Sequence, residues 1–109
     1  MATSYKVLGQ VNPAATTATT AYTVAASTEA IVSSIVVANQ AATAGSYRVA
    51  VRENGDTLAA KHYLAYDISL PANTTDTLTL GVTMNATDVI TVYASSANFS
   101  FNIFGSEIA

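Results

Sequence analysis

Short runs in which hydrophobic and polar residues alternate make up most of the chain. Alternation with a period of two is typical of a β-strand that buries one face. Most of the runs are rich in β-branched residues and are bounded by Gly, Pro, Asn, Asp or Ser, which also favours strands. No window has the period of an amphipathic helix. The pattern therefore predicts strands near residues 5–8, 20–24, 30–38, 46–53, 62–70, 77–83, 88–94 and 98–104.

Alternation also predicts which side chains face the core. Tyr47, Val49 and Val51 point to one face of their predicted strand, and Arg48 and Arg52 point to the other. We expect the apolar set to pack inward and the two arginines to share an outer face. The same reasoning predicts three more one-faced sets: Leu64, Tyr66, Ile68 and Leu70; Leu78, Leu80 and Val82; and Phe99, Phe101 and Ile103.

Turn signals between the runs indicate how the strands connect. Asn54 and Gly55 both tolerate a positive φ, so they fit a two-residue type I′ hairpin turn. Polar turns separate the last four predicted strands at intervals of about ten residues. Seven or eight short strands of this kind predict a single all-β domain over residues 1–109, an antiparallel β-sandwich or jelly roll, with a small barrel as the alternative. The low-complexity segment 13–21 is expected to be a flexible loop, or an arm on a neighbouring subunit.

Length and charge narrow the class of protein. The chain has 109 residues, enough for one domain, and only 10% of them are charged. Its net charge is −3 with four Lys and Arg in total, which argues against a nucleic-acid or anionic-membrane partner because such binding needs a basic surface. No stretch is long and apolar enough to predict a membrane span.

Residues that carry chemistry are few. The single histidine, His62, is expected on the face of Leu64 as a partly buried side chain, and a metal site there would need ligands from elsewhere. The chain has no cysteine, its seven carboxylates show no paired spacing, and its five glycines form no phosphate loop. We therefore expect no catalytic, cofactor-binding or metal-binding residue, no cofactor and no enzymatic activity.

A surface poor in charge is suited to assembly. Few ions must lose their water when it is covered, and few flexible lysines must be ordered. Arg48 and Arg52 are the first candidates for an interface, because an arginine fork can pair with carboxylates of a neighbouring subunit. The face of Tyr63 and the C-terminal strand with Phe104 are the next candidates.

Six blocks of the chain stand out as a set: 4–10 (SYKVLGQ), 30–39 (AIVSSIVVAN), 47–52 (YRVAVR), 62–67 (HYLAYD), 88–93 (DVITVY) and 104–108 (FGSEI). These blocks resemble those of small virion structural proteins of tailed bacteriophages. The likeness is one of pattern, spans nearly the whole chain and includes no catalytic fingerprint.

The resemblance implies a non-enzymatic virion component, assembled in the host cytoplasm. The first interpretation is a capsid decoration, or cement, protein that oligomerises and docks on the major capsid protein. The alternative is a tail, neck or fibre component. We expect a homo-oligomer, with a trimer first, since closed rotational symmetry lets one patch satisfy all copies. A different class also fits the residues, a carbohydrate-binding or receptor-binding β-sandwich module with exposed tyrosines.

Overall fold

The computed structural model describes residues 2–109 and consists of strands with two short helical turns. The turns are η1 (Glu53–Gly55) and η2 (Ala60–His62), so no helix in these residues is long and apolar enough to cross a membrane. The strands are β1 (Thr3–Val11), β2 (Thr19–Thr23), β3 (Glu29–Asn39), β4 (Gly45–Arg52), β5 (Tyr63–Leu70), β6 (Thr75–Leu78), β7 (Val82–Met84), β8 (Val89–Ala94) and β9 (Phe99–Ile108).

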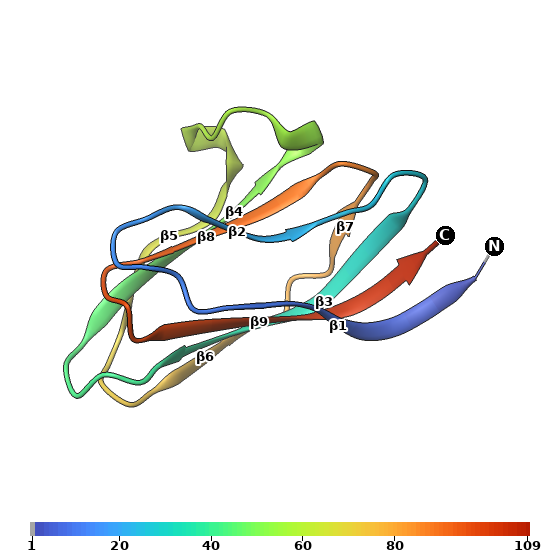
Figure 1. Cartoon of the computed structure of the whole chain (residues 1–109). Helices are drawn as coiled ribbons and strands as arrows, with labels where there is room; N and C mark the ends of the chain where they lie inside the picture. The colour runs from blue at the N-terminus through green and yellow to red at the C-terminus, as the bar shows by residue number, and fades with distance from the viewer. Residues whose placement is uncertain (1) are drawn as a thin grey trace.

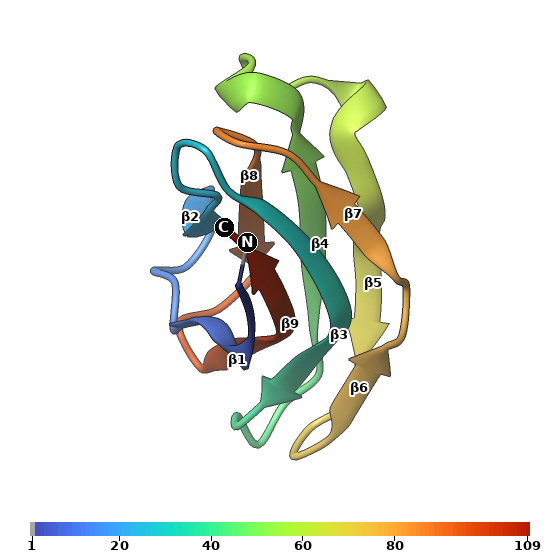
Figure 2. The same cartoon turned by 90° about the vertical axis from the view of Figure 1, so that its right-hand side faces the viewer.

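The strands form two antiparallel sheets that pack face to face (Figures 1 and 2). The first sheet has the order β1-β9-β3-β6, with β7 also paired to β3. The second has the order β2-β8-β4-β5. The protein is therefore an all-β sandwich, as the sequence predicts, with nine strands in residues 2–109 rather than the seven or eight expected.

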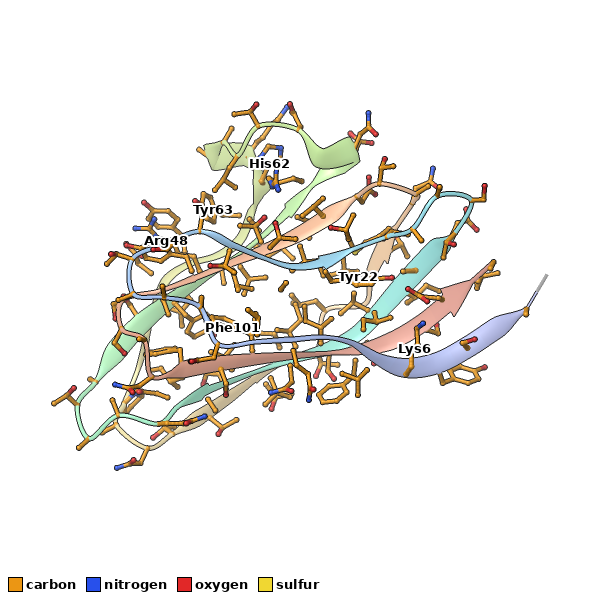
Figure 3. The ribbon with its side chains drawn as sticks, in the orientation of Figure 1. Lys6, Tyr22, Arg48, His62, Tyr63 and Phe101 are labelled. Carbon is orange, nitrogen blue, oxygen red and sulfur yellow. The ribbon has the colours of Figure 1, made fainter. Side chains whose placement is uncertain are left out.

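One hydrophobic core lies between the sheets. Phe99, Phe101 and Ile103 of β9 are fully buried, which confirms their predicted direction. Tyr47 and Val49 of β4 meet them from the second sheet, and the Tyr47 ring lies edge-on to the ring of Phe101 with centroids 6.2 Å apart. Phe101 is seen between the two layers in Figure 3. Because the burial of aromatic and aliphatic side chains supplies most of the folding free energy, β4 and β9 anchor the sandwich.

The burial predicted for the inward set of β5 is confirmed for Leu70 and wrong for the other three residues. Only Leu70 is buried, whereas Leu64, Tyr66 and Ile68 are 47%, 54% and 39% exposed. The register of β5 against β4 shifts twice within eight residues, and each shift exchanges the two faces of the strand. Besides Leu70, Ala65 packs against the core from this strand.

The strand predicted over 77–83 is divided into two. Gly81 has φ +60, which breaks the extended backbone between β6 and β7. Leu78 and Val82 still pack against the core from the two pieces, but Leu80 lies in the connection and is exposed.

The turn at Asn54 and Gly55 has the predicted conformation, but the prediction that it joins two paired strands is wrong. Both residues have positive φ, and the Asp56 amide donates to the Glu53 carbonyl. The chain then continues through η2 before β5 begins, so these two residues do not connect paired strands by themselves. In the segment expected to be a loop, residues 13–18 cross between the sheets, and the residues from Thr19 onward belong to β2.

Candidate functional site: a tyrosine–arginine cluster

Arg48 lies between two tyrosine rings on the outer face of the second sheet. Its guanidinium carbon is 4.2 Å from the centroid of Tyr66 and 4.1 Å from that of Tyr93. A cation over an aromatic face is attracted by the ring quadrupole, and each such contact is worth about 0.5–1 kcal/mol at an exposed site. We call the group formed by Arg48, Tyr63, Tyr66, Asp67 and Tyr93 the tyrosine–arginine cluster.

Strand pairing explains how these residues meet. On one side, Arg48 of β4 lies directly opposite Tyr93 of β8. On the other side, the register shift of β5 leaves Tyr66 and Asp67 together opposite Arg48. This is a β-bulge, in which two residues of one strand face one residue of the other. Asp67 takes φ +50 there, a conformation that aspartate tolerates better than most residues.

The bulge brings a carboxylate to the same guanidinium. Arg48 Nε donates to Asp67 Oδ1 at 2.6 Å, and a terminal nitrogen donates to Oδ2 at 3.3 Å. The hydrogen bond to Asp67 raises the pKa of Arg48, so the guanidinium stays charged. The arginine fork, expected from the sequence to meet a carboxylate of a neighbouring subunit, is thus occupied by Asp67 of the same chain. The cluster presents its tyrosine rings to the outside.

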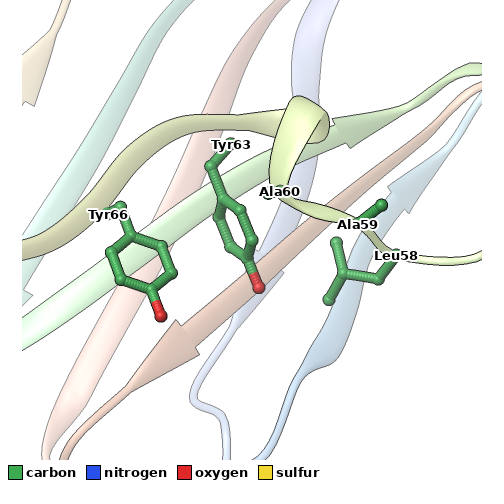
Figure 4. A pocket seen from close by; sticks show the side chains of 5 residues that line it. All are labelled: Leu58, Ala59, Ala60, Tyr63 and Tyr66. Carbon is green, nitrogen blue, oxygen red and sulfur yellow. The ribbon is translucent and has the colours of Figure 1, made fainter.

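A shallow hollow adjoins the cluster where the chain leaves η2 (Figure 4). It has a volume of about 620 Å³ and is lined by Leu58, Ala59, Ala60, Tyr63 and Tyr66. The two tyrosine rings meet edge to face, with centroids 4.9 Å apart. Neither hydroxyl is hydrogen bonded to another residue in the range 2–109, so both are free to bind a partner molecule.

The other predicted interface residues lie apart from this hollow. Arg52 is on the same outer face as Arg48, as predicted, but it is held by Thr91 Oγ1 and by the carbonyls of Gly55 and Asp56. Phe104 lies on the opposite sheet, so the four candidates do not form one surface. Alternation could not identify Tyr66, Asp67 and Tyr93 as neighbours of Arg48, because their meeting depends on the register of three strands.

Phe104 belongs to a second apolar surface, on the outer face of the first sheet. The rows of paired residues place Val7 opposite Phe104 and place Ser106 between Tyr5 and Ile31. A hollow of about 540 Å³ lies among these side chains. We call Tyr5, Val7, Ile31 and Phe104 the Phe104 patch. The two apolar surfaces therefore lie on opposite sides of the sandwich.

His62 lies in η2 rather than on a strand and is buried. Its Nδ1 accepts a hydrogen bond from the Ala59 amide, and its Nε2 is 3.7 Å from Asp56 Oδ2. Its role here is to hold the η2 turn beside the hollow. Within residues 2–109, no three side chains of His, Cys, Asp or Glu come close enough together to hold a metal ion.

A polar network ties the first half of β1 and the end of β9 to the second sheet, and Figure 3 labels two of its members, Lys6 and Tyr22. Lys6 Nζ lies 2.6 Å from one oxygen of Glu107, and the Tyr22 hydroxyl donates to the other. The ion pair with Lys6 and the hydrogen bond from Tyr22 lower the pKa of the Glu107 carboxyl. Burial, together with the contact to Glu107, raises the pKa of Tyr22, which therefore stays a donor.

Replacing Glu107 by glutamine is expected to lower the free energy of unfolding by about 0.5–1 kcal/mol at neutral pH, a modest effect because Lys6 is half exposed and solvent screens the pair. Because the folded-state pKa of Glu107 is lowered, the carboxylate stabilises the fold above its ordinary pKa of 4.5. This stabilisation is lost as the pH falls through the folded-state value. Urea unfolding at neutral and at progressively more acidic pH should show the difference between the two proteins shrinking below pH 4.5, and a constant difference would contradict the prediction.

Known proteins assign no role to these surfaces. No protein-family model matches the chain, and neither a curated protein nor a solved structure matches it. The roles of the tyrosine–arginine cluster and of the Phe104 patch therefore have to follow from their own geometry and chemistry.

Proposed function

We propose that this protein is a non-enzymatic structural component of a bacteriophage virion, in the first place a capsid decoration protein that docks on the shell and stabilises it. The observation that carries the proposal is the exposure of large apolar side chains on the outer faces of both sheets. Exposed apolar patches of this kind are typical of interfaces. The residues are Tyr5, Val7 and Ile31 on the first sheet, and Tyr66 with Leu64 beside it on the second.

The charged side chains support the same proposal. All four basic residues have partners within the chain: Lys6 with Glu107, Arg48 with Asp67, Lys61 with Asp56, and Arg52 with Thr91 and two carbonyls. A basic side chain that already has a partner in its own chain brings no new unpaired charge into an interface. Covering these faces with protein therefore costs little desolvation free energy.

The tyrosine–arginine cluster is the proposed contact with the shell. Tyrosine and arginine are enriched at the energetically dominant positions of interfaces, because they combine a large apolar area with polar groups. Asp67 holds Arg48 in place, and Arg48 in turn supports the Tyr66 ring. The site is thus preorganised, so little side-chain entropy is lost on docking. The adjoining hollow can receive one apolar side chain of the partner.

Replacing both Tyr63 and Tyr66 by serine is expected to leave the sandwich folded and to reduce incorporation into particles at least about tenfold, which corresponds to about 1.4 kcal/mol. Neither ring belongs to the core. Quantitative mass spectrometry of purified particles measures the occupancy, and the melting temperature of the free protein checks the fold. Leu80→Ser is the matched control, because it removes another exposed apolar side chain that lies outside the cluster, in the connection between β6 and β7 of the first sheet. Incorporation of the double variant at the level of this control would contradict docking through the cluster.

The copy number in purified particles tests the function itself. A number that follows the capsomers of the shell supports the decoration protein. A number that follows the symmetry of the tail supports the alternative, a tail, neck or fibre component. Absence from purified particles would refute both. The trimer expected from the sequence rests on a symmetry argument alone and stays a prediction.

A carbohydrate-binding module is the second candidate, and the hollow beside the cluster favours it. An aromatic ring next to free hydroxyls can stack on one face of a sugar while hydrogen bonding to its edge. Figure 4 shows the hydroxyls of Tyr63 and Tyr66 pointing the same way, with Leu58 across from Tyr63. A glycan array separates the candidates: binding that Tyr66→Ala abolishes would support the carbohydrate module.

A further inference from the structure

The N-terminal half of β1 is an open sheet edge. β1 pairs with β9 on one side and has no strand on the other. β2 crosses close to β1 at Gly9, where a Cβ would overlap the Ala21 carbonyl. The segment from Thr3 to Val7 lies beyond this crossing and beyond the register shift that begins after Val7, so it is a regular extended strand.

One pair of residues shows which backbone groups of this segment bond to β9 and which point away from it. Ala2 and Ala109 exchange both of their backbone hydrogen bonds, each at 3.0 Å. In an antiparallel ladder such pairs recur at every second residue. Ser4 and Lys6 therefore bond to β9, whereas the amides and carbonyls of Thr3, Tyr5 and Val7 point away from it. None of these outward groups has a hydrogen-bond partner elsewhere in residues 2–109.

The other sheet edges are protected. β6 and β7 have four and three residues, β2 has five with a register shift, and β5 has two shifts in eight residues. Short length and bulges are the usual means by which proteins prevent edge-to-edge pairing. The first half of β1 has neither, and its one charged side chain, Lys6, is already paired with Glu107 of its own sheet. It also carries Tyr5, which is 85% exposed and is the most exposed large hydrophobic side chain in the described part of the chain.

We propose that a second copy of this protein pairs with this edge, so that β1 and its symmetry mate join two first sheets into one continuous sheet. The two-fold axis passes through Tyr5. This register places Tyr5 opposite Tyr5 of the other copy, and it places Thr3 opposite Val7. Each of the three pairs exchanges two hydrogen bonds, which satisfies every outward amide and carbonyl of the segment.

In this register the side chains of the segment are complementary to those of the same segment in the second copy. An aromatic pair and two pairs of β-branched residues form on the outer face, and cross-strand pairs of these types stabilise antiparallel sheets. The pairing also joins the two Phe104 patches, because Tyr5 and Val7 belong to both surfaces. On the inner face, Lys6 lies opposite Ser4 of the other copy.

The two neighbouring two-fold registers are less favourable. An axis through Ser4 would pair Thr3 with Tyr5 and leave Val7 without a partner among residues 3–7. An axis through Lys6 would place the two ammonium groups directly opposite each other, which destabilises a strand pair. In the Tyr5 register they are staggered, and each keeps its own Glu107. The dimer is independent of the proposed virion function, since a protein without a virion role could form it equally well.

Two opposite charges at Tyr5 test the partner and the register together. Tyr5→Glu and Tyr5→Lys each place like charges opposite one another, so each variant alone is expected to dimerise at least about tenfold more weakly than the wild-type protein. An equimolar mixture of the two should recover dimers, because glutamate then faces lysine. Ile31→Lys is the control, because it adds a charge to the same outer face in the same row but away from the edge. Sedimentation velocity over a range of concentrations measures the association.

Each outcome of these measurements either supports or overturns the pairing of two copies through β1. Dimers of the wild-type protein and of Ile31→Lys, weakened dimers of the single Tyr5 variants and recovery in the mixture support the proposal. A wild-type protein that is monomeric or trimeric at every concentration overturns it, as does a mixture that does not recover. Amide hydrogen exchange of the unmodified protein gives a test that needs no variant. The Tyr5 and Val7 amides should exchange more slowly as the protein concentration rises, and rates independent of concentration would also overturn the pairing.

Discussion

Replacing Gly105 by alanine is expected to lower the free energy of unfolding by about 2–3 kcal/mol, the upper part of the range found when atoms are forced into a packed interior. Gly105 lies in β9 where Lys6 of β1 pairs on one side and Val32 of β3 on the other. A Cβ at this position would overlap the Ile31 carbonyl and lie 3.0 Å from Val32 Cα. These are backbone atoms of the central ladder, so no side-chain rotation relieves the overlap.

The control for this change is Gly81→Asn. Gly81 has φ +60 and has no other residue's atom within 4 Å of a Cβ built there, so only the backbone conformation matters. Asparagine tolerates this conformation, and we expect a cost below about 1 kcal/mol. Urea unfolding of both variants gives the comparison. A Gly105→Ala protein as stable as the control would show that β3 and β9 can separate without cost.

The inward faces of β4 and β9 are predictable because they depend on local information. Alternation in Tyr47 and Val49, and in Phe99 to Ile103, repeats a period that the backbone itself imposes. Each strand is regular over those residues and lies in the middle of its sheet, so alternation correctly predicts which side chains face the core. The two-layer architecture follows from the same residues, because two apolar faces of this size can only be buried against each other.

The tyrosine–arginine cluster depends on information that no local window contains. Arg48 was identified as an outward residue, but its neighbours are set by how β5 and β8 pair with β4. A single bulge at Tyr66 and Asp67 decides that a ring and a carboxylate reach the same guanidinium. Bulges cost little locally and are fixed by the packing of the whole sheet, so alternation fails for the part of β5 that precedes the bulge and holds for Leu70 beyond it.

Asn39 is a second residue whose importance only the folded chain reveals. It ends β3, is 2% exposed, and has all its side-chain groups paired. Its amide nitrogen donates to the carbonyls of Thr43, Leu70 and Pro71, and its oxygen accepts from the Ala41 amide. These bonds fasten the turn that follows β3 to the turn that follows β5. In the sequence it is one polar residue among many that bound a strand.

Replacing Asn39 by alanine is expected to lower the free energy of unfolding by about 2–4 kcal/mol, because buried carbonyls and an amide lose their partner together.

Asn39→Asp has the same shape but sets a carboxylate against the three carbonyl oxygens. We expect a loss at least as large at neutral pH. Since the charged form is disfavoured there, the pKa of the introduced carboxyl is raised, and stability should recover in part as the pH falls and the acid is protonated. Asn73→Asp makes the same change at an exposed site of the neighbouring turn, and it should change stability by less than about 0.5 kcal/mol. Equal losses for Asn39→Asp and Asn73→Asp in urea unfolding, or no recovery of Asn39→Asp in acid, would show that the carbonyls find other donors and that Asn39 does not hold the two turns together.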